Sequence, residues 1–327
     1  MSTEKSPAMS NEAANTRPPL ALIAGPTASG KSDVAVKIAL SLQATGKRAV
    51  VINADSAQVY RDLELLSARP TQQEMRGIEH RLFGAWDGAT PCSAADWANA
   101  ARAEIAKCHQ SGAVPILVGG TGLYLRTLLD GIAPIPAIDP EIRAQVRGLP
   151  VSETYPALIR EDPHRAAALA PADTARIARA LEVIRSTGKP MAWWQERREG
   201  GIGNQVDLKP AILLPDRDAL YERCDRRFAL MLNHGAIHEV ETLLARGLDP
   251  ALPVMRAIGV CEVAGYLQGK WTLDEALARG SQATRNYAKR QFTWFRRQPP
   301  ESWLRHEYDD FSSGPLSEII LRHSGLT

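Results

Sequence analysis

The sequence predicts an α/β fold: a P-loop NTPase-like parallel sheet flanked by helices, with an inserted all-helical domain. The α/β part rests on two observations. Three apolar segments alternate with helical patterns, which is typical of a parallel sheet. They are Leu20–Ala24, Ala49–Asn53 and Val114–Val118. In addition, a glycine-rich loop with the spacing of a phosphate-binding loop follows the first segment and precedes a helical pattern.

The inserted domain is predicted from a change of character in the middle of the chain. Between residues 134 and 204 there are only short helical patterns, broken by prolines and glycines, and Asp173–Arg185 is the clearest. A fourth strand candidate, Pro210–Leu214, follows this region. We therefore expect a core domain of residues 19–133 and 205–327, interrupted by a helical insertion domain of residues 134–204.

Helical patterns account for most of the remaining core. Ser93, with Asp96 three residues later, resembles a capping box that begins a helix running to about Gln110. The pattern after the glycine-rich loop covers Asp33–Ala39. Long helices are expected after the fourth strand, over Asp218–Asn233, Ile237–Arg246, Met255–Leu267 and Leu273–Arg297.

Composition limits the class of protein but not its partner. A chain of 327 residues that is 44% hydrophobic can bury one large core, or a core and a smaller module. Its net charge of +2 neither requires nor excludes nucleic acid. The four cysteines lack metal-like spacing and are expected to be reduced thiols. No apolar stretch is long enough to span a membrane, and residues 1–18 read as a disordered tail, so we expect a cytoplasmic protein.

The glycine-rich loop is a complete P-loop. It consists of Gly25, Pro26, Thr27, Ala28, Ser29, Gly30, Lys31 and Ser32. Its glycines let successive backbone N–H groups point at one anion, and the following helix N-terminus adds partial positive charge. Lys31 is expected to neutralise phosphate oxygens, and the Ser32 hydroxyl to hold Mg²⁺. The loop therefore indicates a ligand with a diphosphate or polyphosphate group.

Two further loops are expected beside the P-loop, because ligands bind beyond the carboxyl ends of parallel strands. Asp55 directly follows the second strand and is either a turn-capping residue or a catalytic base. Thr121 lies among three glycines after the third strand, in a tight turn or close to a ligand. That third strand ends in Gly119 and lacks the acid of a Walker B motif, which argues against a motor or a switch.

Taken in order, these motifs resemble those of the bacterial tRNA dimethylallyltransferases, also called tRNA isopentenyltransferases. The resemblance runs from about Leu20 to Trp303 and is far more specific than the P-loop alone. Besides the P-loop, it rests on Asp55–Tyr60, Ser93–Asp96, Ile116–Leu125, Arg179–Val183 and Ala283–Gln291.

The resemblance implies transfer of a dimethylallyl group from dimethylallyl diphosphate to the N6 amine of adenosine 37 in tRNAs that read codons beginning with U. The P-loop would hold the diphosphate of the donor, with Mg²⁺ on Ser32. Arg227 would help to neutralise the departing group. Asp55 would contact the amine and accept its proton, and Thr121 would also belong to the catalytic site. The protein is expected to be a monomer with no membrane partner.

The resemblance also implies tRNA contacts. The matching positions are Asp55, Ser56, Ala57, Gln58, Thr121, Arg143, Ala175, Arg176, Ile177, Ala178 and Arg179. A further segment matches the family less well, because Val260 and Cys261 replace the usual aromatic and basic residues. That segment is Arg256, Ala257, Ile258, Gly259, Val260 and Cys261.

Two other functions share part of this pattern. A small-molecule P-loop kinase would also use Lys31 and Asp55, and its helical lid would resemble the insertion. Such a kinase transfers the γ-phosphate of ATP to a compact acceptor. A nucleotide-dependent switch would bind ATP or GTP and capture a partner without turnover, but the missing Walker B acid counts against it.

Overall fold

The computed structural model describes residues 17–308 and 313–326. The expected tail, residues 1–18, lies outside the described residues except for its last two. The chain divides into two compact units. Unit 1 contains the residues up to Ser93, Ala100–Gly122, and the residues from Gly203 onward. Unit 2 contains Ala94–Asn99 and Leu123–Ile202.

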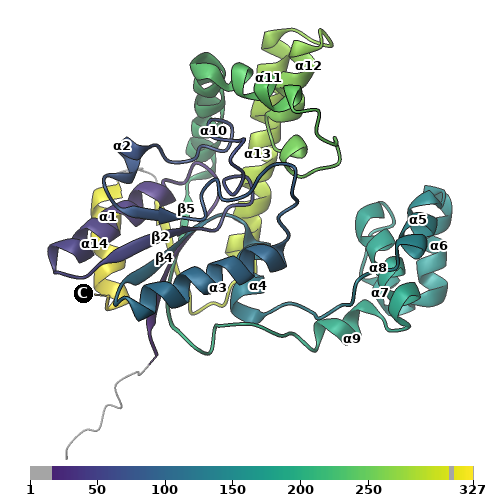
Figure 1. Ribbon diagram of the computed structural model, residues 1–327, viewed down its shortest axis with the longest axis horizontal. Helices are drawn as coiled ribbons and strands as arrows, with labels where there is room; N and C mark the ends of the chain where they lie inside the picture. Colours follow the sequence, from purple (N-terminus) through teal and green to yellow (C-terminus); the bar gives the residue numbers. More distant parts are fainter. Residues whose placement is uncertain (1–16, 309–312, 327) are drawn as a thin grey trace, which may run out of the picture. The chain divides into compact units, whose positions relative to one another are not determined.

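A parallel sheet forms the centre of unit 1 (Figure 1). Within the described residues it has six strands in the order β3-β2-β4-β1-β5-β6. They are β1 (Pro19–Ala24), β2 (Ala49–Asn53), β3 (Glu79–Arg81), β4 (Val114–Gly119), β5 (Asp207–Pro215) and β6 (Leu304–Tyr308). The four predicted strands are confirmed as β1, β2, β4 and β5. The strand β1 pairs with β4 on one side and β5 on the other, so Ala21 lies between Ile116 and Lys209.

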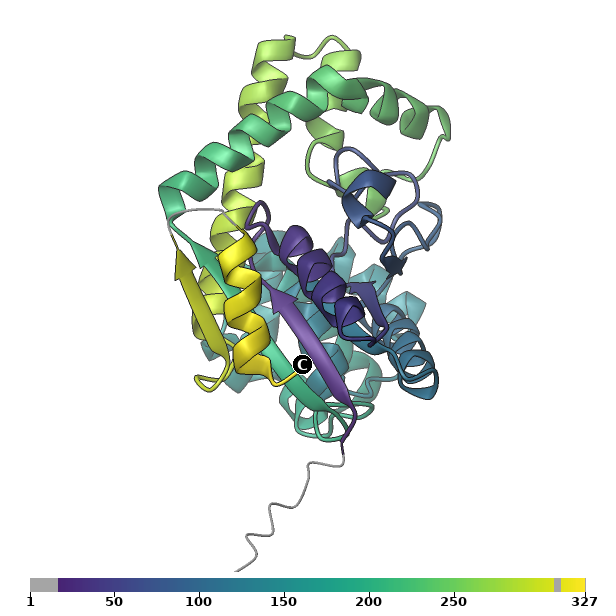
Figure 2. The ribbon, with the colours of Figure 1, turned by 90° about the vertical axis from the view of Figure 1, so that its left-hand side faces the viewer.

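Both faces of the central strands are buried, which explains their continuous apolar runs. On one face Ala21, Ile23 and Val51 pack against α1 (Lys31–Ala44) and α14 (Ser313–Ser324). Figure 2 shows these two helices side by side in front of the sheet. On the opposite face lie residues 100–110 of α3 (Ala94–Gln110) (Figure 1). The predicted helix of residues 93–110 is thereby confirmed.

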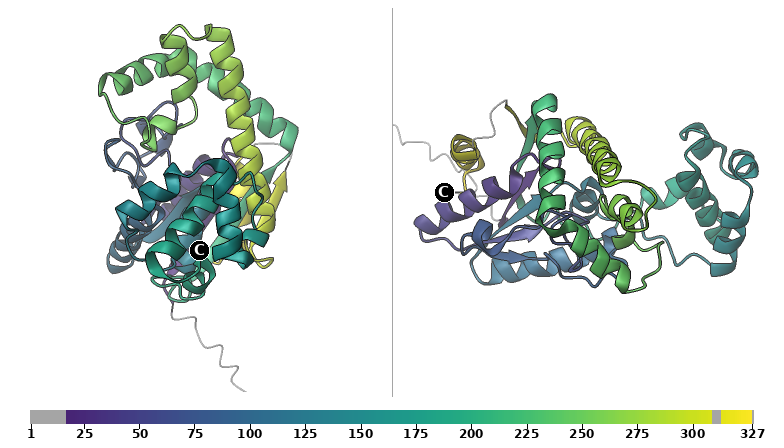
Figure 3. Two further views of the ribbon diagram at one scale, coloured as in Figure 1. Left: turned by 90° about the vertical axis from the view of Figure 1, so that its right-hand side faces the viewer. Right: turned by 90° about the horizontal axis from the view of Figure 1, so that it is seen from above.

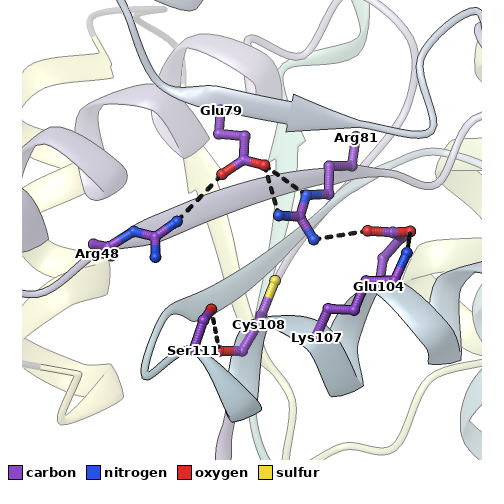
Figure 4. A network of polar contacts seen from close by, with 7 residues as sticks. All are labelled: Arg48, Glu79, Arg81, Glu104, Lys107, Cys108 and Ser111. Carbon is purple, nitrogen blue, oxygen red and sulfur yellow. Dashed lines mark hydrogen bonds and ion pairs between the residues drawn. The ribbon is translucent and has the colours of Figure 1, made fainter.

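The short edge strand β3 is tied to the rest of unit 1 by an ion-pair network (Figure 4). Arg81 contacts Glu79 on its own strand at 2.6 Å and Glu104 on α3 at 2.7 Å. Glu104 also pairs with Lys107 at 2.7 Å, and Arg48 approaches Glu79 at 3.6 Å. Single exposed ion pairs contribute little, but a linked set of charges holds a strand that has few apolar contacts of its own.

The other helices of unit 1 lie between strands in sequence, α2 between β2 and β3 and the rest between β5 and β6. They are α2 (Gln72–Met75), α10 (Arg217–Met231), η1 (Leu232–Ala236), α11 (Ile237–Ala245), η2 (Val254–Arg256), α12 (Val260–Leu267) and α13 (Leu273–Arg297). The helix α13 begins where predicted, because Thr272 and Glu275 form a capping box. It packs along α10, as Figure 2 shows.

One helix prediction is wrong. The segment Met255–Leu267 is not continuously helical, because α12 begins only at Val260. Gly259 has a φ of 95°, and a Cβ there would lie 2.6 Å from a side-chain carbon of Leu66. A glycine in this conformation ends one turn and starts the next, so the apolar spacing on its two sides does not belong to one helix.

Unit 2 is helical, and its helices between residues 140 and 187 lie together in the right-hand view of Figure 3. They are α4 (Gly122–Asp130), α5 (Pro140–Gly148), α6 (Val151–Glu161), α7 (Pro163–Ala167), α8 (Thr174–Thr187) and α9 (Met191–Gln195). The predicted helix at residues 173–185 is confirmed as α8, which Asp173 caps and Gly188 ends with a φ of 65°. Leu158, Ile177 and Leu181 are central to the core between α5, α6 and α8.

Candidate active site

The loop between β1 and α1 has the backbone shape of an anion-binding loop. Ala28 and Gly30 have φ angles of 63° and 80°, and alternation of this kind lets neighbouring N–H groups converge on one anion. Gly25 lies so close to β5 that a Cβ would be 2.6 Å from the carbonyl oxygen of Leu213. The helix α1 starts at Lys31 and points its N-terminus at the loop. This part of the chain therefore suits a phosphate group.

Two serine hydroxyls of the loop have no partner in the described part of the chain. Ser29 is 1% exposed, and its Oγ is buried without a hydrogen bond. Ser32 is half-buried in the first turn of α1, and its hydroxyl also forms no hydrogen bond there. A buried hydroxyl without a partner costs roughly 1–3 kcal/mol. A ligand with several oxygen atoms, and a hard cation beside it, would satisfy both groups.

The Lys31 side chain folds back onto the same loop. Its Nζ donates a hydrogen bond of 3.0 Å to the carbonyl oxygen of Pro26. Burial lowers the pKa of Lys31 to about 8, although the Asp55 charge opposes the shift; the Arg227 charge adds to it. A bound anion would supply the negative charge that this environment lacks, and would draw the pKa of Lys31 back up.

Two arginines on α10 also reach the P-loop. Arg227 donates a hydrogen bond of 2.5 Å to the Thr27 hydroxyl, and Arg223 donates one of 3.1 Å to the carbonyl oxygen of Ala28. Burial lowers the pKa of Arg227, while nearby Cys224 and Asp55 oppose that shift. Guanidinium groups stay protonated under ordinary conditions, so the loop is surrounded by fixed positive charge.

Asp55 begins the loop that follows β2. Its Oδ1 accepts hydrogen bonds from the backbone N–H groups of Ala57 at 2.9 Å and Gln58 at 3.4 Å. The other carboxylate oxygen, Oδ2, has no hydrogen-bond partner among the described residues. The turn-capping role and a chemical role are therefore compatible, because each uses a different oxygen.

Three hydroxyl groups meet beside Asp55. The Thr121 Oγ1 accepts a hydrogen bond of 3.0 Å from the backbone N–H of Ser56, and the two side-chain oxygens are 3.3 Å apart. The Tyr287 hydroxyl on α13 lies close to both side chains and near the Asp55 charge. Burial, aided by the Asp55 charge, raises the pKa of Tyr287 well above its ordinary value, so this phenol remains a proton donor.

Gln291, one turn after Tyr287, joins two of the loops. Its Oε1 accepts a hydrogen bond of 2.7 Å from the backbone N–H of Thr27. Its Nε2 donates one of 2.9 Å to the carbonyl oxygen of Gly120. Gln291 is 5% exposed, and both polar atoms of its carboxamide form hydrogen bonds. The P-loop and the loop after β4 are thus held at a fixed separation.

No acid could replace the glycine at the end of β4. A Cβ at Gly119 would lie 2.2 Å from the backbone carbonyl carbon and oxygen of Ala54. A Cβ at Gly120 would lie 2.3 Å from the Gln291 side chain. The absence of a Walker B acid therefore follows from packing, since the β2 loop occupies the space that its side chain would need.

The structure assembles part of the predicted set around the carboxyl ends of the strands in unit 1. Lys31, Asp55, Thr121 and Arg227 belong to this group, and electrostatic effects connect Asp55 to both cations. The Arg256–Cys261 segment spans the end of η2 and the start of α12, with Arg256 and Cys261 exposed. Arg143 lies on α5 of unit 2, and Ala175, Arg176, Ile177, Ala178 and Arg179 lie on α8.

Besides Arg223 on α10, two members of the site on α13 were not predicted as functional residues. Tyr287 and Gln291 lie in a recognised motif, but their partners are more than 160 residues away in sequence. Their spacing of four places both on one face of α13 and was the only local signal. Ser29 was predicted, although nothing in the sequence indicated that its hydroxyl would be buried without a partner.

A sequence profile of the IPP transferase family matches residues 58–298 of this chain. The chain belongs to the IPP transferase family. Family members with closely similar sequences include a tRNA dimethylallyltransferase from Erythrobacter litoralis, 66% identical over 295 residues that cover 90% of this chain and 93% of the relative. Another, from Novosphingobium aromaticivorans, is 64% identical over 85% of this chain and 99% of the relative. The resemblance seen in the sequence is confirmed.

Solved structures support the same fold. A tRNA isopentenylpyrophosphate transferase from Bacillus halodurans is 33% identical and has a TM-score of 0.68, with coverage of 94% of this chain and 96% of that one. A eukaryotic dimethylallyltransferase, described as acting on tRNA, has a TM-score of 0.79 at 24% identity and covers 94% and 79% of the two chains. The predicted fold class is thereby confirmed.

Proposed function

We propose that this member of the IPP transferase family transfers a dimethylallyl group from dimethylallyl diphosphate to the N6 amine of adenosine 37 in tRNAs that read codons beginning with U. The products are N6-isopentenyladenosine and diphosphate. The observation that carries the proposal is that the P-loop lies near the Asp55 carboxylate and that a Walker B acid is absent. One oxygen of this carboxylate, Oδ2, has no hydrogen-bond partner among the residues that the structure describes.

The cationic groups around the P-loop suit a departing diphosphate. When the bond between C1 of the dimethylallyl group and the bridging oxygen breaks, its electrons leave with the diphosphate. Lys31 and Arg227 would stabilise the charge that develops there, and their positions are fixed before reaction by hydrogen bonds to Pro26 and Thr27. Such preorganised charge is commonly the largest electrostatic contribution to catalysis.

Asp55 is placed to activate the acceptor. The exocyclic amine of adenine is a weak nucleophile because its lone pair is delocalised into the ring. As N6 forms its bond to C1, it must lose a proton, and Asp55 Oδ2 is the acceptor that we assign. A base in this role contributes typically ~10²–10⁴-fold to the rate. Thr121, hydrogen-bonded to Ser56 and close to Tyr287, would orient the adenine beside Asp55.

The loop also suits Mg²⁺ bound together with the donor. Mg²⁺ prefers hard oxygen ligands and keeps several waters, so one protein hydroxyl and the diphosphate oxygens are enough. Ser32 supplies that hydroxyl. Among the described residues no cluster of three or more His, Cys, Asp and Glu side chains could form an all-protein site. When bound, the ion would add positive charge on the leaving group.

The tRNA contacts form two groups. One lies in unit 1 and consists of Asp55, Ser56, Ala57, Gln58 and Thr121, in loops that follow strands, together with the Arg256–Cys261 segment between η2 and α12. The other lies in unit 2, on α5 and α8, and makes the helical insertion a tRNA-binding domain. The target base must leave its stack to reach Asp55, and a single-stranded anticodon loop makes that step less costly than opening a duplex.

The experiment that tests the proposal is nucleoside mass spectrometry. The full chain is incubated with dimethylallyl diphosphate, Mg²⁺ and an anticodon stem-loop RNA that carries adenosine 37. We expect N6-isopentenyladenosine, and no product with a matched RNA that carries guanosine at this position. Failure to modify the adenosine RNA would overturn the proposal. Robust γ-phosphate transfer from ATP to a small acceptor would favour a kinase instead.

We also propose that the enzyme works as a monomer in the cytoplasm, where its tRNA substrates are found. None of the helices in the described part of the chain combines the length and the apolar character that a membrane crossing requires. Sedimentation of the purified full chain, with and without stem-loop RNA, tests the oligomeric state; a stable dimer would contradict it.

A further inference from the structure

A buried carboxylate in unit 2 is shared by three arginines. Glu182 on α8 is 2% exposed. Its nearest ion-pair distances are 3.0 Å to Arg147, 3.4 Å to Arg179 and 4.0 Å to Arg143. Arg143 and Arg147 come from α5, and Arg179 lies one turn before Glu182 on α8. We call these four residues the Glu182 cluster.

The cluster contains more positive charge than its own stability requires. A buried carboxylate needs a partner, but one well-placed arginine is enough to neutralise it. Three arginines around one glutamate leave two positive charges over. The arginine side chains are 47%, 66% and 41% exposed for Arg143, Arg147 and Arg179, so this excess charge faces solvent.

The hydrogen bonds also leave donors unused. Arg147 binds Glu182 through Nε, and neither of its terminal nitrogens has a hydrogen-bond partner in the described part of the chain. Arg179 uses only Nη1. A guanidinium fixed at one edge presents its remaining N–H groups in a planar fork, which matches the oxygens of a phosphate.

A second ion pair in unit 2, whose carboxylate is less buried, has a different composition. Arg185 and Glu161 pair one to one at 2.6 Å, and their side chains are 28% and 31% exposed. Arg185 donates two hydrogen bonds to Glu161, at 2.9 Å from Nε and 2.6 Å from Nη2. The charges of this pair therefore balance. The excess charge is a property of the Glu182 cluster and is not shared by the Arg185–Glu161 pair.

We propose that the Glu182 cluster binds backbone phosphates of the RNA substrate, with Arg147 as a direct contact and Glu182 as a positioning residue. The inference rests on the proposed function, because it assumes an RNA substrate, and it adds two residues that the sequence did not assign. Glu182 accepts a hydrogen bond from Arg147 and another from Arg179, so these two arginines lose less side-chain freedom when a phosphate binds.

Charge and positioning make opposite predictions for Glu182→Gln. The substitution removes a negative charge, so simple attraction would tighten RNA binding. If Glu182 positions the arginines, binding weakens although the protein has become more positive. Glu161→Gln is the matched control, since it makes the same charge change at the neutral pair.

The test measures steady-state prenylation and equilibrium binding of an anticodon stem-loop RNA by the full chain at several salt concentrations. For Arg147→Gln we expect KM for RNA to rise about tenfold with little change in kcat, and the slope of log KM against log salt to fall by about 0.7–0.9. Arg147→Lys should recover the salt slope but only part of the affinity, because it keeps the charge without the fork.

For Glu182→Gln we expect weaker RNA binding, while Glu161→Gln binds as the wild type or slightly tighter. Circular dichroism melting separates a folding defect from a binding defect. If Glu182→Gln fails to fold, Arg147→Gln still tests the inference, because Arg147 is exposed and its substitution should not disturb the fold. Unchanged RNA affinity in Arg147→Gln, or tighter binding by folded Glu182→Gln, would overturn the inference. Wild-type protein that binds RNA but does not prenylate it would overturn the proposed function instead.

Discussion

The side-chain oxygen of Gln291 accepts a hydrogen bond of 2.7 Å from the backbone N–H of Thr27, which joins α13 to the P-loop. The amide of the same side chain holds the loop after β4 through Gly120. One carboxamide thus sets the distance between the proposed diphosphate site and the loop that carries Thr121.

Gln291→Ala should therefore reduce both stability and donor binding. It leaves a buried N–H and a buried carbonyl without partners, so we expect the free energy of unfolding to fall by about 2 kcal/mol. We also expect KM for dimethylallyl diphosphate to rise. Urea unfolding and steady-state kinetics measure the two effects. Gln110→Ala, at the exposed end of α3, is the control; equal effects of the two substitutions would show that the bridge is unimportant.

Asp55→Asn should lower kcat by ~10²–10⁴-fold. Asparagine keeps an Oδ1 that can accept the hydrogen bonds from Ala57 and Gln58, so the loop should persist while the base is lost. Single-turnover prenylation measures the effect. Asp249→Asn is a matched control, because Asp249 accepts a similar loop hydrogen bond from Ala251 in an exposed segment. Near-normal turnover by Asp55→Asn would remove Asp55 from its assigned role.

The pKa of Lys31 predicts proton uptake on ligand binding. In the free protein this pKa is about 8, so the amine is about half protonated at pH 8. A bound diphosphate raises the pKa again, and the protein takes up part of a proton. Titration calorimetry with magnesium diphosphate in two buffers of different ionisation enthalpy detects it. Lys31→Arg should abolish the uptake, since arginine is already charged; if uptake persists, another group titrates.

The same pKa predicts how ligand-free stability depends on pH. It is lowered on folding from 10.5 to about 8, so between these values the unfolded chain holds more protons than the folded one. Stability contributed at this residue therefore rises as pH increases from 8 to 10.5. Urea unfolding measures the free energy of unfolding of the wild type and of Lys31→Met. Relative to Lys31→Met, the wild type should gain unfolding free energy as the pH increases from 8 to 10.5. A constant difference would contradict the assignment.

Gly119→Ala should be strongly destabilising. Its Cβ would lie 2.2 Å from backbone atoms of Ala54, which cannot move without displacing the Asp55 loop. We expect a loss of about 3 kcal/mol or more of unfolding free energy. Gly148→Ala, where a Cβ meets nothing within 4 Å, should change stability by less than about 1 kcal/mol. Thermal unfolding compares the stability of the two variants. A mild loss of stability in Gly119→Ala would show that a side chain, and so a Walker B acid, could be accommodated at this position.

The sequence predicted the interior of the fold better than its edges. Strands buried on both faces, such as Val114–Gly119, are apolar throughout and were found from that pattern. Glu79–Arg81 and Leu304–Tyr308 were missed because both are polar edge strands, held by a neighbour on one side only. The position of the first depends on ion pairs, and that of the second on its pairing with β5. Neither leaves a periodic pattern in the local sequence.

The site divides in the same way. The P-loop was predicted from its own residue pattern, and Asp55 from the rule that ligands bind at the carboxyl ends of parallel strands. Tyr287 and Gln291 act through partners that folding brings from the other end of the core, and spacing along α13 could not identify those partners. Glu182 was inside a recognised motif, but only its burial among three arginines distinguishes it from an ordinary helix-surface glutamate.

Because β1 pairs with β5, the sheet cannot be completed until long after β1 has been synthesised. Pro19 pairs with Asp207, roughly 190 residues later in the chain, and all of unit 2 is translated between them. At about 5–20 residues per second, β1 waits on the order of 10–40 s on the ribosome before its second neighbour exists. During that interval one edge of a strand from the middle of the sheet is open to incorrect pairing. Translation of the helical unit thus acts as a delay, and the nascent chain is most vulnerable to aggregation before β5 emerges.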